Sequence, residues 1–437
     1  MDRATRAFEQ GLLRNRSFLA IWGAQILSQT AANALTSALI VLVFAQTKAN
    51  TASSFLILLA IVPAVIFGPL AGVMVDRTDR KLVLYLTNLA RGFGVLLLVP
   101  LTDSVPAAYL VNFLVATATV FFVPAEAATL PKIVRKRDLL LANSLFSLTF
   151  NGSFLLGFSL LAPALIALFD FDTLFIVLAV MYFLAALLIT VLPKAEPVQQ
   201  VLGVDVAGKA VTQTQRDIRA AIRYLNAHRR LSWVLGYVAL TYMLIAVAGA
   251  LTPGFVTETL DLSEREVYVL SFPAGLCVAA GLVALNLIGR RLPRADAIHW
   301  GLLVTAVSLL GLAAARPALR FLRTIAVGAA DPQPVFIALV IATAVAFGAA
   351  YAFITVPSFT LLQEELADDM RGRVFAVLNT LVSVVSLVPL LIVGSVADRF
   401  GVGPVLAFAG VVVLAVWIAG RGAHLPRDGI EAEPSPA

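Results

Sequence analysis

Twelve apolar runs, each long enough to cross a membrane as a helix, dominate this chain. A bilayer-spanning helix needs about 20 mostly apolar residues, and polar or Gly/Pro-rich breaks separate the runs. The predicted spans are residues 17–45, 53–75, 82–101, 107–128, 142–168, 173–192, 232–257, 267–289, 298–315, 334–360, 374–396 and 402–420. Only 13% of the 437 residues are charged, whereas a soluble domain has about 25%. The sequence therefore predicts an all-α membrane protein.

The first run is expected to stay in the membrane, because it is far longer than the apolar segment of a signal peptide and no small-residue cleavage site follows it. The one cysteine, Cys277, lies in the eighth run, which excludes a disulfide within the chain.

Positive charges gather on one side of the predicted membrane. With twelve spans, the amino terminus and every even-numbered loop share a side, and that side holds 25 Lys and Arg residues against 6 on the other, with Arg91 inside the third run. By the positive-inside rule both termini are cytoplasmic, and we expect a multi-pass protein of a bacterial inner membrane. The net charge of +6 follows from this topology, so no nucleic-acid partner is predicted.

A long polar interruption divides the spans six and six. The predicted parts are an amino-terminal bundle (1–193), a cytoplasmic linker (194–231), a carboxy-terminal bundle (232–420) and a cytoplasmic tail (421–437). Within the linker, Ile218, Ile222 and Leu225 share one helical face, which fits an amphipathic helix on the membrane surface. A solvated connector helix fits the same pattern, and the sequence leaves both open.

The two halves echo each other. Val123-Pro124 lies near the end of the fourth run and Val356-Pro357 near the end of the tenth, and a charged stretch then precedes an asparagine near the next run in each half. Two six-helix bundles related by duplication are the expected layout of a rocking transporter with its substrate site near the midplane.

A short charged loop joins the second and third runs, with the sequence Gly72-Val-Met-Val-Asp76-Arg77-Thr-Asp-Arg80-Lys81. The Asp76 carboxylate can meet the positive end of a helix in the opposite half, while Arg77, Arg80 and Lys81 can bridge the cytoplasmic gap. Such contacts would favour one state of a two-state element, which makes this loop a candidate gate. The alternative is a plain positive-inside anchor.

This loop resembles the signature Gly-x-x-x-Asp-Arg-x-Gly-Arg-Lys/Arg of the major facilitator superfamily. Phe122-Val-Pro-Ala, Leu362-Gln363 and Arg371-Gly372-Arg373-Val-Phe are similar to a bacterial branch that includes macrolide-efflux and siderophore-export proteins. The resemblance implies two pseudo-symmetric six-helix bundles and secondary transport by alternating access.

Three local features depart from or imitate the family pattern. Asp79 replaces the glycine of the loop signature, which puts its tight turn in question. The fifth run keeps Gly152 and Gly157 without the proline of the antiporter signature, although small residues still allow close helix packing. A second Gly394-Ser-Val-Ala-Asp398-Arg-Phe-Gly follows the eleventh run, on the external side. We interpret it as a turn that ends a helix, with an external gate as the alternative.

Polar side chains recur with helical spacing in four runs that line the cavity in this superfamily. Because polar groups cost free energy in hydrocarbon, they are expected to face a wet cavity or to bond a neighbouring helix. The candidate cavity residues are Gln25, Gln29, Asn33, Asn143, Ser147, Asn151, Tyr237, Thr241, Asn379 and Ser383. Their setting is otherwise apolar, which favours an amphiphilic organic substrate over an inorganic ion.

Three charged residues are candidates for coupling transport to an ion. Arg91 lies inside the third run, and Glu126 and Glu364 lie near the cytoplasmic ends of the fourth and tenth. A guanidinium at the bilayer centre needs a partner or water, unless Arg91 snorkels to the headgroups. No carboxylate falls clearly at the midplane, so proton coupling rests on family analogy.

The sequence argues against an enzyme, because its three histidines lie in or beside cytoplasmic segments and no His-Glu-x-x-His or Gly-x-Ser-x-Gly motif occurs. No metal or cofactor is predicted. We expect a monomeric secondary transporter that exports a small amphiphilic compound, with protons as the coupling ion. A lysophospholipid, siderophore or metabolite transporter is the alternative, and a non-transporting receptor is the alternative from another class.

Overall fold

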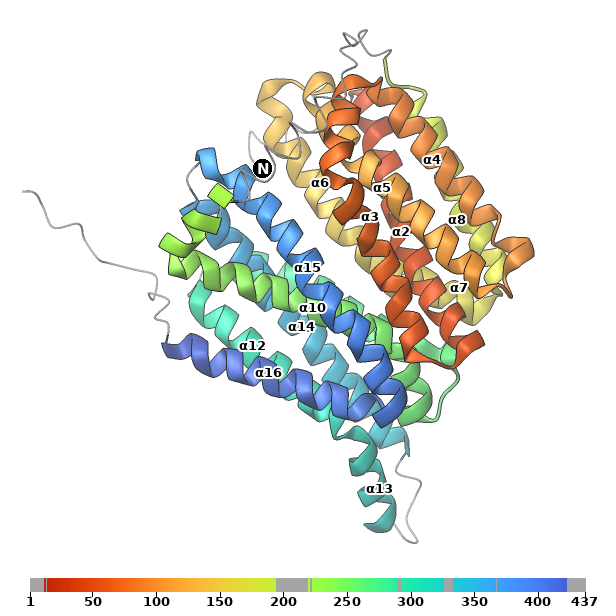
Figure 1. Ribbon diagram of the computed structural model, residues 1–437, viewed down its shortest axis with the longest axis vertical. Helices are drawn as coiled ribbons and strands as arrows, with labels where there is room; N and C mark the ends of the chain where they lie inside the picture. The colour runs from red at the N-terminus through yellow and green to blue at the C-terminus, as the bar shows by residue number, and fades with distance from the viewer. Residues whose placement is uncertain are drawn as a thin grey trace, which may run out of the picture. The chain divides into compact units, whose positions relative to one another are not determined.

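The computed structural model describes residues 12, 14–193, 219–220, 222–288, 293–325, 333–366 and 368–422, and every regular element in these ranges is helical (Figure 1). The all-α prediction is confirmed for them.

The first half of the chain contains six predicted spans. Its helices are α2 (Arg16–Thr47), α3 (Asn50–Arg77), α4 (Arg80–Leu96), α5 (Val105–Ile133), α6 (Leu139–Phe154), the π-helical segment η4 (Leu155–Leu161), α7 (Ala162–Leu168) and α8 (Phe171–Ile189), with short 3-10 turns η2 (Val99–Leu101) and η3 (Lys136–Asp138). The fifth span is thus built from α6, η4 and α7 in succession.

The second half supplies the other six spans. Its helices are α10 (Arg229–Leu260), the 3-10 turn η5 (Glu264–Val267), α11 (Tyr268–Ile288), α12 (Arg294–Ala313), α13 (Ala315–Ile325), α14 (Gln333–Glu365), α15 (Asp368–Phe400) and α16 (Val402–Gly422).

Every predicted span coincides with a helix or, for the fifth, with consecutive helical segments. Within the described residues, nine helical stretches are long and apolar enough to cross a membrane, and α4, α11 and α15 occupy the predicted third, eighth and eleventh positions. The short helix α13 was not predicted. It follows the ninth span directly and is amphipathic, with Leu319 buried and Arg316 and Arg320 exposed.

The predicted linker helix is described in part. Residues 219–220 and 222–227 are helical, Leu225 is buried and Ile222 is exposed. Ile218 and the preceding linker lie outside the described residues. A membrane-surface helix and a solvated connector both stay predictions for this segment.

Contacts divide the chain into two compact units. The first comprises residues 1–217, 246–272 and 387–398, and the second comprises residues 218–245, 273–386 and 399–437. The helices α10, α11 and α15 therefore contribute to both units. Among the described residues, the first unit is the predicted amino-terminal bundle together with the end of α10, the turn η5, the start of α11 and residues 387–398 of α15.

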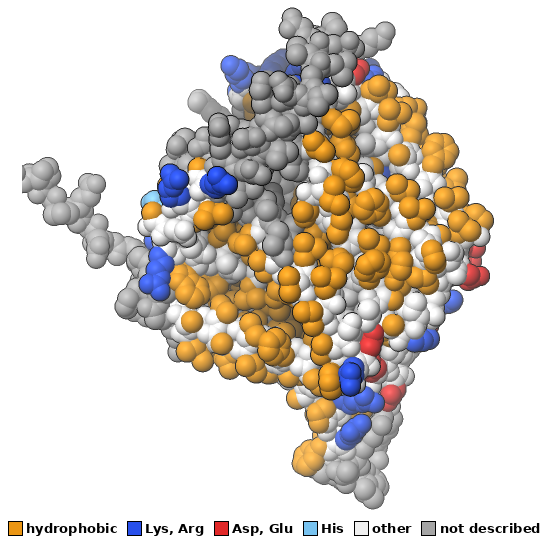
Figure 2. All heavy atoms as spheres, in the orientation of Figure 1, with side chains coloured by type: hydrophobic (Ala, Val, Ile, Leu, Met, Phe, Trp, Pro, Cys, Tyr) orange, Lys and Arg blue, Asp and Glu red, His pale blue; other side chains and the backbone are white. Residues whose placement is uncertain are grey.

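The outer surface of the first unit is apolar. Figure 2 shows hydrophobic side chains over α3, α4 and α5, and charged side chains near the helix ends. Phe93 is 61% exposed, and Leu86, Leu110 and Leu187 are at least half exposed. Large contiguous apolar surface is unfavourable in water but is expected where helices face hydrocarbon.

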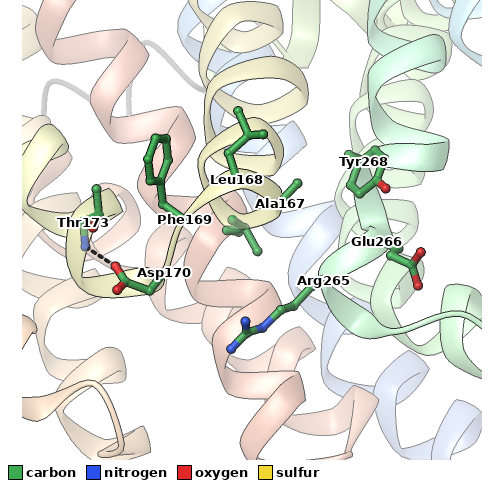
Figure 3. Close-up of a pocket in the computed structure, with 9 residues that line it drawn as sticks. Ala167, Leu168, Phe169, Asp170, Thr173, Arg265, Glu266 and Tyr268 are labelled. Atoms are coloured by element: carbon green, nitrogen blue, oxygen red, sulfur yellow. Dashed lines mark hydrogen bonds between the residues drawn. The ribbon is translucent and has the colours of Figure 1, made fainter.

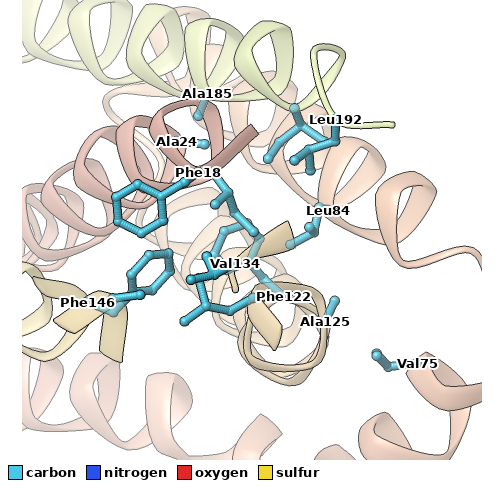
Figure 4. Close-up of a cluster of buried hydrophobic side chains, with 14 of the residues drawn as sticks. Phe18, Ala24, Val75, Leu84, Phe122, Ala125, Val134, Phe146, Ala185 and Leu192 are labelled. Carbon is cyan, nitrogen blue, oxygen red and sulfur yellow. The ribbon is translucent and has the colours of Figure 1, made fainter. Parts of the chain in front are cut away.

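A buried apolar cluster joins six helices of the first unit (Figure 4). Phe18 of α2, Leu84 of α4 and Phe122 of α5 are each fully buried in it. Val75 of α3, Phe146 of α6 and Ala185 of α8 complete the cluster. This packing fixes the relative positions of the helices that carry the charged loop at Arg80 and the buried Arg91.

Gly157 allows the fifth span to approach the first span closely. A Cβ at this position would overlap the Thr30 carbonyl oxygen and would lie 2.9 Å from both the Ala34 nitrogen and the Asn33 Cβ. Gly152, five residues earlier, has no heavy atom within 4 Å of the same added atom. Of the two glycines, only Gly157 packs closely against a neighbouring helix.

Gly157→Val is expected to lower the free energy of unfolding by about 1–3 kcal/mol, because the added side chain would push η4 away from the α2 backbone. Gly152→Val is the matched control and should leave stability within about 0.5 kcal/mol of the parent. Thermal unfolding of the purified proteins in detergent measures both. Equal losses for the two variants would contradict the close-packing role of Gly157.

Candidate functional site

The loop between α3 and α4 turns without glycine. Asp79 has φ −64° and caps α4, accepting hydrogen bonds from the Lys81 backbone N–H at 2.8 Å and the Leu82 backbone N–H at 3.4 Å. A negative φ suits any L-residue, and aspartate is a preferred helix cap. The replacement of the family glycine by Asp79 is therefore compatible with a tight, capped turn.

The cations of this loop bind carbonyl groups of neighbouring helices. Arg80 Nη1 donates to the Ala128 carbonyl oxygen at 3.1 Å, and Lys81 Nζ donates to the Thr190 carbonyl oxygen at 2.7 Å. A second acceptor for Lys81 is the Leu192 carbonyl oxygen, at 2.5 Å. These bonds join the start of α4 to α5 and to the end of α8, so they hold the first unit together.

The other members of the predicted gating loop lie on α3. Gly72 has open space around its Cα, and Arg77 is half-buried in the last turn, where a cation complements the helix dipole. Asp76 belongs to the same helix, and its side chain lies outside the described part of the structure.

Similar charged contacts occur in the second unit. Arg294, at the start of α12, donates to the Glu364 carboxylate at the end of α14. Arg230, at the start of α10, lies 2.9 Å from the Glu365 carboxylate. The predicted coupling residue Glu364 is thus half-exposed and ion-paired, and it connects the ninth and tenth spans as Arg80 connects the third and fourth.

The polar stripe predicted on the first span is largely buried inside the first unit. Gln25 is 3% exposed, and its Nε2 donates to the Phe146 carbonyl oxygen of α6 at 3.3 Å. Gln29 is also buried, and Asn33 Nδ2 donates to the Gln29 carbonyl oxygen at 2.9 Å. Gln25 therefore bonds a neighbouring helix, which is the alternative that the sequence left open.

The other predicted cavity residues fall into three groups. Asn143 and Ser147 are exposed on one face of α6. In the second unit Tyr237 and Thr241 are buried, and the Thr241 hydroxyl donates to the Tyr237 carbonyl oxygen at 2.7 Å. The side chains outside the described residues are those of Asn151, Asn379 and Ser383.

Two titratable side chains, Arg91 of α4 and Glu126 of α5, are buried in the first unit. Arg91 is 2% exposed, and its guanidinium carbon lies 4.6 Å from the centroid of the Phe122 ring and 5.8 Å from that of Tyr182. Glu126 is 6% exposed and interacts electrostatically with Arg91. An arginine that snorkelled to the headgroups would have an exposed tip, so this burial argues against snorkelling.

The buried pair has unused hydrogen-bonding capacity. Nε and Nη2 of Arg91 and one carboxylate oxygen of Glu126 find no hydrogen-bond partner among the described residues. A buried charge needs a partner or water, and cation–π contacts replace only part of its hydration. These unpaired atoms leave the site with donors and an acceptor that a bound water molecule could satisfy.

A pocket of about 360 Å³ lies between the end of α7, the start of α8 and the turn η5 (Figure 3). The order of the helices places it at the ends opposite the Arg80 loop. It is lined by residues 166–170, Thr173, Arg265, Glu266 and Tyr268. The Thr173 backbone N–H donates to Asp170 at 2.7 Å, and hydrogen bonds from Thr173 hold the pKa of Asp170 below its ordinary value. The pocket contains none of the predicted site residues.

Two further contacts near these helix ends were missed by the sequence reasoning. Lys48 pairs with Glu264 at 2.9 Å. Burial raises the pKa of the Glu264 carboxyl, but the hydrogen bond and charge of Lys48 outweigh this and hold the pKa below its ordinary value. Asp398 accepts hydrogen bonds from the start of α3. In the sequence, Asp398 belongs to the second Gly-x-x-x-Asp-Arg motif, which we interpret as a turn that ends a helix, with an external gate as the alternative.

The sequence profile of the Major Facilitator Superfamily matches residues 21–389. The chain therefore belongs to this superfamily, and it is a multi-pass membrane transporter rather than an enzyme. It is 24% identical over 366 residues to the MFS-type transporter YfiS of Bacillus subtilis (strain 168), covering 81% of this chain and 80% of that protein. It is 23% identical over 413 residues to macrolide efflux protein A of Streptococcus pyogenes, covering 92% of this chain and 94% of that protein.

Solved transporter structures share the fold. A bacterial homologue of the human lysosomal transporter Spinster, inward-facing and occupied, aligns with TM-score 0.70 at 13% identity over 99% of this chain and 100% of that one. A bacterial homologue of the iron transporter ferroportin, inward-facing, aligns with TM-score 0.67 at 16% identity over 94% and 99%. At these identities the likeness establishes the fold alone.

Arg91→Met and Glu126→Gln are each expected to lower the free energy of unfolding by about 3–5 kcal/mol, because either change leaves one charge buried without its partner. The double variant should lose less than the sum of the two single losses, since both charges are then absent. Denaturant unfolding of the four proteins in detergent measures this cycle. Additive losses would show that the two groups do not act as a pair.

Proposed function

We propose that this protein exports a small amphiphilic organic compound from the cytoplasm across a bacterial inner membrane, by alternating access coupled to protons. It works as a monomer with both termini in the cytoplasm. The distribution of 25 cationic residues on one side against 6 on the other supports this orientation. The name of the Streptococcus pyogenes relative, a macrolide efflux protein, supports both the direction and the amphiphilic class of substrate.

The buried pair Arg91–Glu126 is the single observation that carries the coupling. Both side chains are buried, and three of their polar atoms have no hydrogen-bond partner among the described residues. When the site opens to one side of the membrane, water from that side can reach the Glu126 carboxylate and deliver or remove a proton. Protonation of Glu126 leaves Arg91 without its counter-charge, so the proton changes the local electrostatics of α4 and α5.

The surface of the fifth span supports an amphiphilic substrate. Asn143 and Ser147 are exposed on α6, and the exposed apolar residues of the same helix include Leu148 and Phe150, at 68% and 54%. Hydrogen-bonding groups beside apolar area suit a ligand that carries both kinds of surface. The described residues of this surface bear no charge, which suits organic cargo better than a phosphorylated sugar.

The loop from Gly72 to Lys81 serves as the cytoplasmic gate in this proposal. The Asp79 cap and the bonds of Arg80 and Lys81 support the loop on the first unit. That leaves Asp76 and Arg77 as the members of the motif proposed to contact the other half when the cytoplasmic side closes.

Proteoliposomes containing the purified protein are expected to accumulate a radiolabelled macrolide when a pH gradient is imposed, and empty liposomes are not. A gradient of one pH unit is sufficient for about tenfold accumulation in one-to-one exchange. If a wide panel of amphiphilic compounds moves no faster than in empty liposomes, the proposed export function is wrong.

Glu126→Gln keeps the shape of the side chain but cannot exchange a proton. Accumulation driven by the pH gradient should fall by at least about tenfold, because the proton no longer contributes to the driving force. Exchange of labelled for unlabelled substrate without a gradient should persist. Glu364→Gln is the matched control and should retain the pH response, since its carboxylate is already engaged by Arg294. Wild-type accumulation by the Glu126 variant would exclude it as the coupling group.

A further inference from the structure

The amino end of α3 has no cap from its own segment. The residue before the helix is Ala49, which has no side-chain hydrogen-bond acceptor. By contrast, α2, α4 and α8 are capped by Asn15, Asp79 and Asp170, each directly before its helix. The first N–H groups of a helix need an acceptor, so α3 must find one elsewhere.

Asp398, at the far end of α15, supplies that acceptor. One of its oxygens accepts from the Asn50 backbone N–H at 2.6 Å, and the other accepts from the Thr51 backbone N–H at 3.0 Å and the Thr51 hydroxyl at 2.5 Å. Asn50 and Thr51 are 348 and 347 residues away from Asp398 in the sequence. A carboxylate at a helix amino end is favoured by both the hydrogen bonds and the helix dipole.

Glycines make this contact close. A Cβ at Gly394, one turn before Asp398, would lie 2.5 Å from Thr51 Cα and 2.7 Å from the Ser54 hydroxyl oxygen. A Cβ at Gly254 of α10 would overlap the Asn50 side chain. Both positions therefore need glycine for α10 and α15 to reach the start of α3 at these distances.

An ion pair lies beside the capped helix end. Lys48, at the turn between α2 and α3, pairs with Glu264 in the turn after α10. An exposed pair of this kind contributes little stability alone, but its position means that the α2–α3 turn contacts the ends of both α10 and α15. All these residues belong to the first unit.

We propose that Asp398, Gly394 and the Lys48–Glu264 pair form a latch that closes the side of the transporter opposite the Arg80 loop, with the start of α3 as its receptor. The inference rests on the proposed alternating access, because a latch needs a state in which these helix ends separate. The motif Gly-x-x-x-Asp-Arg thus occurs at both gates of the proposed transporter. The copy at Gly72 belongs to the cytoplasmic gate, and the copy at Gly394 belongs to the external latch.

Chemical labelling tests the latch without any transport measurement. Ser54 is 1% exposed beneath Gly394, so Ser54→Cys in a Cys277→Ser background places a single thiol behind the latch. Asp398→Asn should increase the rate at which a membrane-impermeant maleimide labels this thiol in intact cells by about tenfold, because the charged cap is lost. Gly394→Ala should do the same by separating the backbones.

Asp170→Asn is the matched control, since Asp170 is also an aspartate cap at the same ends of the first unit's helices but binds its own helix. Its labelling rate should equal that of the parent. Equal rates for the Asp398, Gly394 and Asp170 variants and the parent would overturn the latch.

A cross-link tests the need for separation. The Thr51 and Ser395 hydroxyl oxygens are 3.4 Å apart, so Thr51→Cys with Ser395→Cys should form a disulfide on oxidation. Transport should then stop and return on reduction, and unchanged transport after complete cross-linking would exclude the latch. If no substrate is ever found, the labelling result still decides the latch, and the export function fails on its own.

Discussion

Polar groups inside hydrocarbon have no water to bond, and this constraint governs the structure from its helices to its loops. Each span satisfies its backbone within itself, but every helix end leaves N–H or C=O groups that need other partners. Asn15 and Asp79 satisfy such groups locally. Asp398 satisfies them for α3 from the other half of the chain. Helix ends are thus the places where spans are joined to one another.

The charged contacts of the two units follow one pattern. In the first unit Arg80 joins the start of α4 to α5, and in the second Arg294 joins the start of α12 to α14. These are the third and fourth spans in one half and the ninth and tenth in the other. The two halves resemble each other in the sequence around Pro124 and Pro357. They also resemble each other in the charged contacts that join their third and fourth spans at the side rich in positive charge.

The buried residues Arg91 and Glu126 differ from the charged contacts at the helix ends in their burial and in their hydrogen bonding. The Arg294–Glu364 ion pair is partly exposed, and its carboxylate accepts a hydrogen bond from the guanidinium. Arg91 and Glu126 are buried with unused hydrogen-bonding atoms in the described part of the chain, so their electrostatics depend on whether water or a proton is present. In the proposed transport cycle, a group of that kind changes with the state of the transporter, whereas the charged contacts at the helix ends hold each unit together.

The sequence by itself determined the all-helical membrane fold, the positions of the spans and the superfamily, because each depends on local run length, charge and motif spacing. It could not determine which polar side chains face a neighbour. Gln25 bonds α6, Arg91 is buried against Phe122, and the amphipathic α13 was missed because its apolar face is short. Nor could it show that Asp398 caps α3. Those outcomes depend on which helices lie side by side, and residues hundreds of positions apart meet only when the tertiary packing brings their helix ends together.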